Sequence, residues 1–281
     1  MTNKTKIIVN TLVIAVVVLL IGGATFAVKN HKNSNQAQTV KTDTWADLEA
    51  DGTITIGLDD TYVPMGFRDT KGNLVGFDVD LANATFKKLG LKVKWQPIDW
   101  SMKETELNTG NIDAIWNGYT ISPEREKKVA FSQSYLDGYQ ELVVKSNSGI
   151  TAFAGMKNKV LGLQTASTAE DLFNAQPKLL KNIVKDQTSV GYDTFDKAFD
   201  DLNAGRIDGL LIDNTYANYY IAHQKNPSAY RVIKGDVPVD KTGVGFRKSD
   251  VTLRKKVDAT LTEFKKDGTL AKIEQKWFGN N

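Results

Sequence analysis

The sequence predicts an α/β protein made of two similar lobes. From Thr53 to Thr109, short apolar runs rich in β-branched residues alternate with stretches of helical periodicity, in the order strand, helix, strand, helix. A second series of the same kind begins near Val160. This alternation is typical of a mainly parallel sheet covered by helices, in which ligand sites lie at the carboxyl ends of the strands.

The first series runs from residue 45 to the helix start near residue 123. It comprises a helix from Trp45, a strand over 53–57, a helix over 77–89, a strand over 93–95, a helix over 103–109 and a strand over 111–116. Apolar residues three and four positions apart predict the helices. Gly90 and Gly110 suit the position just past a helix end, because glycine adopts the left-handed conformation found there.

The second series follows a strong β run at 142–144. It comprises a strand over 160–163, helices over 169–174 and 195–204, a strand over 207–212, strands at 237–238 and 244–246, and two helices within 251–278 separated by Gly268. The phrase Gly205-Arg206-Ile207-Asp208 echoes Gly110-Asn111-Ile112-Asp113, since each ends a helix on glycine and enters a buried strand. The echo is short, and it agrees with two lobes built alike.

Composition and charge restrict the class of function. With 281 residues and 41% apolar content, the chain can bury one large core or two modest ones. Four of the 36 basic residues lie in 1–40, so 32 basic residues face 33 acidic ones in 41–281, which offers no basic face for a nucleic acid. With His31 and His223 as the two histidines and no cysteine, we expect no metal, no cofactor and no Ser-His or thiol chemistry.

Residues 1–28 predict an export signal or a membrane anchor. Lys4 and Lys6 precede an apolar run to Val28, an order typical of signal peptides and a length sufficient to span a bilayer. Cleavage near Ala27 is one alternative, but the run lacks a clear small-residue ending, which favours an uncleaved anchor on the outer face of the membrane. Residues 29–44 are polar and are expected to form a flexible tether.

The stretch 117–125, Asn-Gly-Tyr-Thr-Ile-Ser-Pro-Glu-Arg, has the features of an anion-binding turn. Ser122 stands where a helix N-cap belongs and Pro123 at the first helical position, so backbone N–H groups point out of the turn. Arg125 follows, and its guanidinium can hold a carboxylate through two parallel hydrogen bonds. An ordinary capped helix with a solvated arginine is the alternative interpretation.

With its neighbouring motifs, this stretch resembles the amino-acid branch of the extracytoplasmic solute-binding proteins (family 3) that feed ABC importers. The motifs are Gly76-Phe77-Asp78-Val79-Asp80-Leu81, Gly118 to Arg125, and Phe131-Ser132-Gln133-Ser134-Tyr135, within a resemblance that runs from about Trp45 to Gly279. It implies a two-lobed, type II periplasmic-binding-protein-like fold in which each lobe is a mixed sheet flanked by helices, joined by a two-strand hinge. Lobe 1 would be 41–139 with 237–281, and lobe 2 would be 140–236. Many relatives carry a lipid on a cysteine, which this chain lacks, so retention at the membrane would need residues 1–28.

The resemblance implies a receptor for a free amino acid rather than an enzyme. Arg125 would pair with the α-carboxylate, assisted by the backbone or the hydroxyl of Thr120 and by the N–H of Thr168 from the opposite lobe. Asp213 would take the α-ammonium, together with the carbonyl of Gly118. As alternatives, Asp213 and Thr168 could serve only as caps of the helices that follow them.

The resemblance also implies which residues select the ligand's side chain. They are Asp59, Tyr62, Trp100, Asn117 and Gln164. Tyr62 and Trp100 would sandwich the side chain, although a surface aromatic and a core aromatic are the alternatives. Asn117 and Gln164 are neutral and can both donate and accept hydrogen bonds. Together these residues predict a polar neutral ligand, with glutamine or cystine favoured.

The implied partner is the permease of an ABC importer. We expect the protein to be a monomer whose lobes close on the ligand, and the closed form to be recognised by the permease. Two other classes of function stay open. A lyase or dehydratase of the same fold would need a catalytic acid in the cleft, and the nearest candidates, Glu124 and Glu141, are expected to be structural. A ligand-sensing domain would need a further membrane span and a cytoplasmic output, and the sequence up to Asn281 predicts neither.

Overall fold

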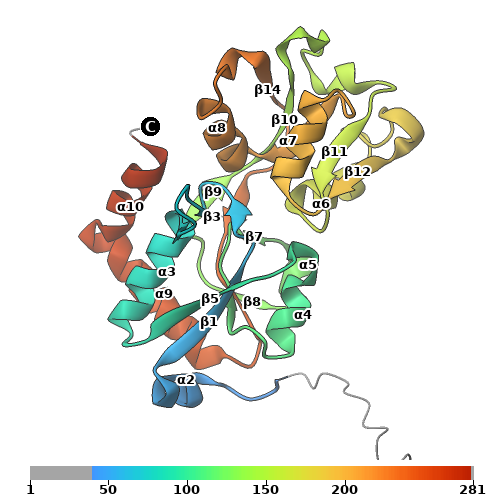
Figure 1. The fold of residues 1–281 in the computed structure, drawn as a ribbon. Coiled ribbons are helices and arrows are strands. Elements are labelled where there is room, and N and C mark those ends of the chain that lie inside the picture. Colours follow the sequence, from blue (N-terminus) through green and yellow to red (C-terminus); the bar gives the residue numbers. More distant parts are fainter. Residues whose placement is uncertain (1–39, 280–281) are drawn as a thin grey trace, which may run out of the picture. The chain divides into compact units, whose positions relative to one another are not determined.

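The computed structural model describes residues 40–279, which form two lobes, each built on a five-stranded mixed sheet (Figure 1). The predicted anchor, 1–28, and most of the predicted tether, 29–44, lie outside these residues. Within 40–279, no helix has both the length and the apolar character needed to cross a membrane. The end of the expected tether is part of the fold, because the Val40 N–H donates to the Asn108 carbonyl and the Thr44 hydroxyl donates to Asp250, each at 3.0 Å.

The first lobe is organised around the sheet β5-β1-β6-β16-β8. Its strands are β1 (Thr53–Leu58), β5 (Lys92–Pro97), β6 (Ala114–Ile115), β8 (Ala130–Phe131) and β16 (Gly245–Phe246). Strand β1 runs parallel to β5 and β6, and β16 is antiparallel to β6 and β8. The sheet is therefore mixed, as the resemblance implies.

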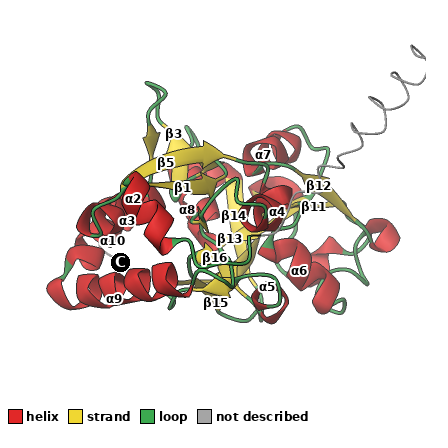
Figure 2. Ribbon diagram, turned by 90° about the horizontal axis from the view of Figure 1, so that it is seen from below, coloured by secondary structure: helices red, strands yellow, loops and turns green. Residues whose placement is uncertain are grey.

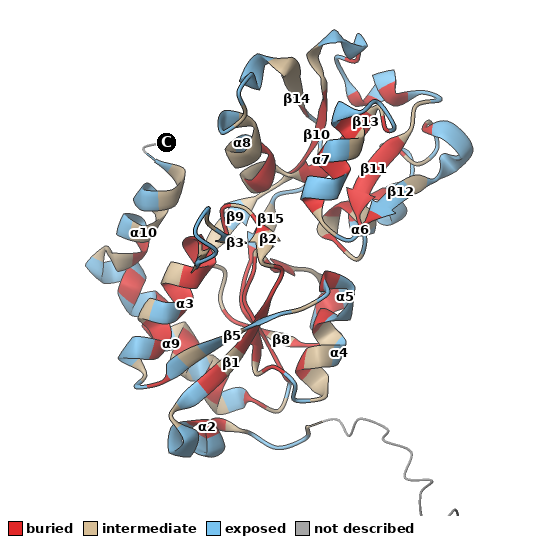
Figure 3. Ribbon diagram, viewed as in Figure 1, coloured by how far each residue is buried: buried red, intermediate tan, exposed pale blue. Residues whose placement is uncertain are grey.

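Helices cover both faces of this sheet. They are α2 (Trp45–Asp51), α3 (Phe77–Lys88), α4 (Lys103–Asn108), α5 (Pro123–Glu126), α9 (Val251–Asp267) and α10 (Thr269–Phe278). Figure 1 places α3, α9 and α10 on one side of the strands and α4 and α5 on the other. Buried residues concentrate on the strands and on the inward faces of the helices (Figure 3), so the core lies between the sheet and its helices.

The second lobe repeats this plan around the sheet β12-β11-β13-β10-β14. Its strands are β10 (Gln140–Lys145), β11 (Leu161–Gln164), β12 (Ser189–Tyr192), β13 (Gly209–Asp213) and β14 (Tyr230–Lys234), and its helices are α6 (Thr168–Ala175), α7 (Phe195–Asn203) and α8 (Asn214–Ala222). Strand β11 is parallel to β12 and β13, whereas β10 is antiparallel to β13 and β14. Seen as in Figure 2, α9 and α10 lie at one end of the molecule and α6 lies toward the other, with the strands between them.

Two small sheets and several 3₁₀ turns complete the described part. The first small sheet joins β2 (Thr61–Tyr62), β3 (Gly66–Arg68) and β4 (Leu74–Val75), and the second joins β7 (Thr120–Ile121), β15 (Asp240–Thr242) and β9 (Leu136–Gly138). The 3₁₀ turns are η1 (Trp100–Met102), η2 (Ser146–Ser148), η3 (Phe153–Met156), η4 (Lys185–Gln187) and η5 (Pro227–Ala229). Strand β15 is antiparallel to both β7 and β9, so the two segments that lead to and from the second lobe are hydrogen-bonded to each other.

Among the predicted strands, two differ most from the structure. The strand expected at 237–238 is absent, and β15 begins at Asp240 instead. Pro238 has no N–H to give to a ladder and Val239 is 65% exposed, so neither suits a buried strand. The strand expected at 111–116 is reduced to Ala114–Ile115, because Asn111 and Ile112 turn back to hydrogen-bond the end of α4.

Candidate functional site

A small cavity is lined by residues of both lobes. The first lobe contributes Asp59, Tyr62, Trp100, Asn117, Gly118 and Arg125, and the second contributes Gln164, Ser167, Thr168 and Asp213. Every predicted site residue except Thr120 is on this lining, and Ser167 is an addition. The structure thus brings residues separated by more than 100 positions to one cavity.

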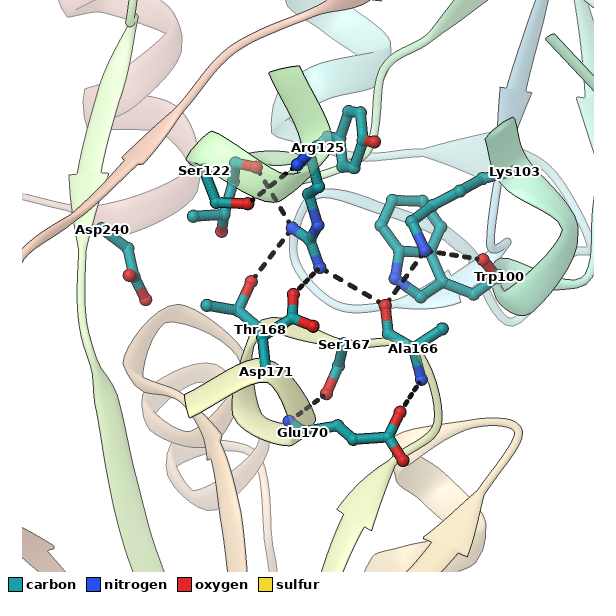
Figure 4. Close-up of polar contacts among 12 residues, drawn as sticks. Trp100, Lys103, Ser122, Arg125, Ala166, Ser167, Thr168, Glu170, Asp171 and Asp240 are labelled. Atoms are coloured by element: carbon teal, nitrogen blue, oxygen red, sulfur yellow. Dashed lines mark hydrogen bonds and ion pairs between the residues drawn. The ribbon is translucent and has the colours of Figure 1, made fainter. Parts of the chain in front are cut away.

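Arg125 lies at the start of α5, where the predicted cap is present. The Ser122 hydroxyl accepts from the Arg125 N–H at 3.3 Å, and Pro123 occupies the first turn. Arg125 is 4% exposed, which contradicts the alternative of a solvated arginine. Its Nη1 donates to the Thr120 carbonyl at 3.1 Å and to Thr168 Oγ1 of the other lobe at 3.1 Å (Figure 4). Thr120 therefore positions Arg125 with its carbonyl instead of lining the cavity.

The first turn of α6 faces Arg125 from the second lobe. Ser167 is the N-cap of this helix, because its hydroxyl accepts from the Glu170 N–H at 3.3 Å. Thr168 is the next residue and makes no cap, so its hydroxyl is available to accept from Arg125. The start of α6 therefore lies beside Arg125, and the free N–H groups of a helix N-terminus favour an anion.

Asp213 ends β13 and occupies the N-cap position of α8, yet its side chain makes no capping hydrogen bond. The carboxylate instead accepts from Gln140 Nε2 at 2.7 Å, and it is also hydrogen-bonded by the Tyr62 hydroxyl. Burial raises the pKa of Asp213, although these hydrogen bonds to the charged form oppose the shift. Gln140 Nε2 donates to Asp240 as well, at 2.9 Å, and burial raises the pKa of Asp240 to about 6.

The opposite end of the cavity is rich in hydrogen-bond acceptors. Asp59 accepts from the N–H and the hydroxyl of Thr61 at 2.9 and 2.6 Å, and from Gln164 Nε2 at 3.1 Å. Gln164 Nε2 also donates to the Asp193 carbonyl at 2.8 Å, and the Asp59 N–H donates to Asn117 Oδ1 at 3.1 Å. Burial raises the pKa of Asp59. A ligand group that reaches this end can donate a hydrogen bond to these acceptors or accept one from Asn117 Nδ2, which is buried and has no partner among the described residues.

Two aromatic side chains form the remaining walls. Tyr62 packs against Phe195 and Tyr216 of the second lobe, with ring centroids 5.8 and 5.5 Å apart. Trp100 is 8% exposed and meets Tyr119 edge to face at 5.7 Å. Both residues line the cavity. Tyr62 is therefore more than a surface aromatic, and Trp100 is more than a core residue.

Comparison with known proteins places the chain in a family. Residues 54–280 match the bacterial extracellular solute-binding proteins, family 3. The L-cystine-binding protein TcyJ of Escherichia coli is 34% identical over 230 residues, which cover 81% of this chain and 83% of that protein. The chain belongs to family 3 of the bacterial extracellular solute-binding proteins.

Solved structures agree with this assignment to family 3. A substrate-binding protein of an ABC uptake transporter from Streptococcus pneumoniae, with bound histidine, has 47% identity and a TM-score of 0.84, and the match covers 86% of this chain and 98% of that one. An ancestral arginine-binding protein bound to glutamine has 36% identity and a TM-score of 0.74, with 82% and 99% covered. The two-lobed, type II fold predicted for this chain is therefore confirmed.

Glu124 and Glu141, the candidates for a catalytic acid, both lie away from the cavity lining. Glu124 is exposed and pairs with Lys127, whereas Glu141 is fully buried, and neither lines the cavity. Burial raises the pKa of Glu141 to about 7. Within residues 40–279, no group of three or more histidine, cysteine, aspartate or glutamate side chains could hold a metal ion.

Three further residues, Lys103, Gln140 and Ala166, shape this site without a clear signal in the sequence. Gln140 donates to the carboxylates of Asp213 and Asp240. This role becomes visible only from the pairing of Gln140 with Asp213 in the second sheet. Lys103 is buried beside Trp100, and Ala166 offers its carbonyl to the first lobe. The spacing of Lys103 three residues after Trp100 is a weak signal, because such spacing is common in any helix.

Proposed function

We propose that this protein is an extracytoplasmic receptor that binds a free amino acid between its lobes and delivers it to the permease of an ABC importer. The buried Arg125 carries the proposal. A free amino acid needs a cation for its carboxylate and an anion for its ammonium group, and the cavity offers Arg125 and Asp213 on one lining. The named relatives in the same family bind cystine or histidine, which supports an amino acid as the ligand.

The side chain of the ligand would lie between Tyr62 and Trp100 and reach Asp59 and Gln164. The Gln164 amide group already donates to Asp59, whereas Asn117 Nδ2 has no partner among the described residues. This end therefore offers both acceptors and a free donor, and it suits a side chain that can both donate and accept hydrogen bonds. Glutamine offers an amide and cystine offers a second ammonium group. We therefore favour a polar neutral ligand, glutamine or cystine, while the carboxylate of Asp59 makes histidine and arginine the competitors to test.

Binding would draw the lobes together, because each lobe supplies only part of the contacts. We propose residues 41–139 with 237–281 as lobe 1 and 140–236 as lobe 2, with the paired strands β9 and β15 forming the hinge. The family is extracellular, and we propose that residues 1–28 tether this monomeric member to the outer face of the membrane.

A ligand panel tests the proposal. We expect glutamine or cystine to raise the melting temperature, since a ligand at 100 times its Kd adds about 2.7 kcal/mol of stability. Histidine, arginine, lysine and glutamate belong in the same panel, and calorimetry on each hit gives its Kd. A larger shift with arginine or histidine would replace the favoured ligand but keep the receptor function. No shift with any amino acid would contradict the receptor function itself.

A further inference from the structure

Lys103 is a buried cation that contacts both lobes. It is 1% exposed, and no other lysine in residues 40–279 is buried. Its Nζ donates to the Trp100 carbonyl at 3.1 Å in its own lobe and to the Ala166 carbonyl of the other lobe at 3.0 Å (Figure 4). Lysine is almost never fully buried unless its ammonium group is paired, so this position requires a specific reason.

The Ala166 carbonyl is an acceptor shared by two cations of the first lobe. Besides Lys103, it accepts from Arg125 Nη2 at 3.3 Å. Ala166 has a φ of 56°, a left-handed conformation that costs a residue with a side chain on the order of 1 kcal/mol. Its N–H donates to Glu170 Oε2 at 2.7 Å. The strained peptide is thus held with its carbonyl toward the first lobe, directly before Ser167 and Thr168, which line the cavity.

Charged groups of both lobes lie near Lys103, whose Nζ also lies over the rings of Trp100 and Tyr119, 4.9 and 6.0 Å from their centroids. Glu104, on the same helix, lies 3.7 Å away, and its other oxygen lies 3.9 Å from the exposed Lys128. Arg125 faces Lys103 from α5, and Asp171 on α6 lies 3.3 Å from Arg125. Burial, and after it the charges of Arg125 and Lys128, lower the pKa of Lys103 to about 8, against the attraction of Glu104 and Asp171.

We propose that Lys103 is a positioning residue for the carboxylate end of the ligand. Its ammonium group holds the Ala166 carbonyl, and through it the first turn of α6, over the carboxylate bound by Arg125. It also places a second positive charge beside that carboxylate without lining the cavity. The inference rests on the proposed function. It predicts that Lys103 strengthens ligand binding when both lobes contact the ligand.

The matched variants Lys103→Met and Lys128→Met test this role in the full chain. Methionine keeps a long apolar side chain but removes the charge and the bond to Ala166. With glutamine, or the panel amino acid that gives the largest shift, we expect Lys103→Met to raise Kd at least tenfold, since a hydrogen bond to a charged group contributes roughly 1.5–3 kcal/mol. Most of the loss should appear as faster dissociation in stopped-flow tryptophan fluorescence. Lys128→Met removes an exposed neighbour of the same Glu104 and should leave Kd unchanged.

The pH profile separates this role from simple packing. A carboxylate bound beside Lys103 raises its pKa above about 8, so its contribution to affinity is complete below pH 8 and is lost as the pH rises through the bound value. Wild-type affinity should therefore fall more between pH 7 and 10 than that of Lys103→Met. Lys103→Arg, which keeps the charge at high pH, should restore part of the affinity and remove the slope.

The outcomes distinguish this inference from the proposed function. If the wild type binds an amino acid but Lys103→Met binds it within twofold, with the same pH slope, Lys103 only packs within the first lobe and the inference is wrong. If the wild type binds no amino acid, the proposed function itself fails. If Lys103→Met does not fold, Lys103→Arg and the wild-type pH profile still test the inference. A wild-type affinity that does not fall between pH 7 and 10 would contradict the positioning role of Lys103.

Discussion

Gly118 shows how a single residue fixes the geometry of the cavity. Its φ is 59°, and a Cβ at this position would lie 2.7 Å from the Tyr62 ring. Its N–H donates to Asp78 Oδ2 at 2.6 Å, which anchors the loop to α3. Only glycine combines this backbone conformation with contact against Tyr62.

Gly118→Ala should therefore displace Tyr62 and weaken ligand binding at least tenfold, with a loss of stability of roughly 1–3 kcal/mol. Gly72→Ala is the matched control, since Gly72 also has a positive φ, of 82°, but no atom lies within 4 Å of its Cβ position. Calorimetry and urea denaturation on both variants check the prediction. Equal affinities for the two variants would show that Tyr62 does not depend on Gly118.

At the scale of single residues, the sequence predicts the cavity lining well and its supporting contacts poorly. Arg125 is predictable because the cap, the proline and the arginine are adjacent in the sequence, and the structure contains the local turn that this pattern predicts. The bond from Lys103 to Ala166 joins residues 63 positions apart, and no local pattern reports where a backbone carbonyl points. The resemblance implies a contact through the backbone or the hydroxyl of Thr120, and in the structure the Thr120 carbonyl contacts Arg125 instead of lining the cavity.

Among the elements, strand β10 carries a buried acid at the entry to the second lobe. Glu141 is 0% exposed, and neither carboxylate oxygen has a hydrogen-bond partner among the described residues. Burial raises its pKa to about 7 from the ordinary value of 4.5, although Lys234 opposes the shift. Because the folded pKa is the higher one, its contribution to stability is complete below about pH 4.5 and is lost as the pH rises through about 7.

Glu141→Gln should remove this part of the pH dependence. At pH 4 the variant and the wild type should have similar free energies of unfolding, and at pH 7.5 the variant should be more stable by on the order of 3 kcal/mol. Urea denaturation at the two pH values measures the difference, with Glu124→Gln, whose side chain is 74% exposed, as the control. A Glu141→Gln profile parallel to that of the wild type would show that Glu141 titrates near its ordinary value.

Long elements were predicted more accurately than short ones. The helices within 251–278 were expected on either side of Gly268, and α9 and α10 lie there. Apolar periodicity over several turns identifies such helices, whereas strands of two or three residues carry too little pattern, as the shift from 237–238 to Asp240–Thr242 shows.

The repeated phrase has a structural basis in both sheets. Asp113 Oδ2 accepts from the Thr55 N–H at 2.9 Å, and Asp208 Oδ2 accepts from the Val160 N–H at 2.8 Å. In each case the aspartate N–H donates back to the carbonyl of the same partner, at 2.7 and 2.9 Å. The same device thus fixes the third parallel strand in each lobe, which explains why the echo predicted two lobes built alike.

At the scale of the whole molecule, fold class was predictable because each lobe repeats a strand and helix order that the sequence displays. What could not be predicted is the set of bonds between the lobes, such as those from Arg125 to Thr168 and from Gln164 to Asp59. These bonds depend on the approach of two surfaces. They are also the contacts through which a ligand would favour the closed arrangement.

The central claim is that an amino acid bound between the lobes is held by Arg125. Calorimetric titration of wild type, Arg125→Ala and the control Arg254→Ala with the amino acid identified by the panel tests it most directly. Arg254 pairs with Asp258 at 3.9 Å on α9, outside the cavity lining, and its substitution should not affect binding. We predict that Arg125→Ala raises Kd at least 30-fold, because removing one partner of a buried charged pair costs roughly 2–5 kcal/mol. An Arg125→Ala variant that binds as tightly as Arg254→Ala would contradict the account.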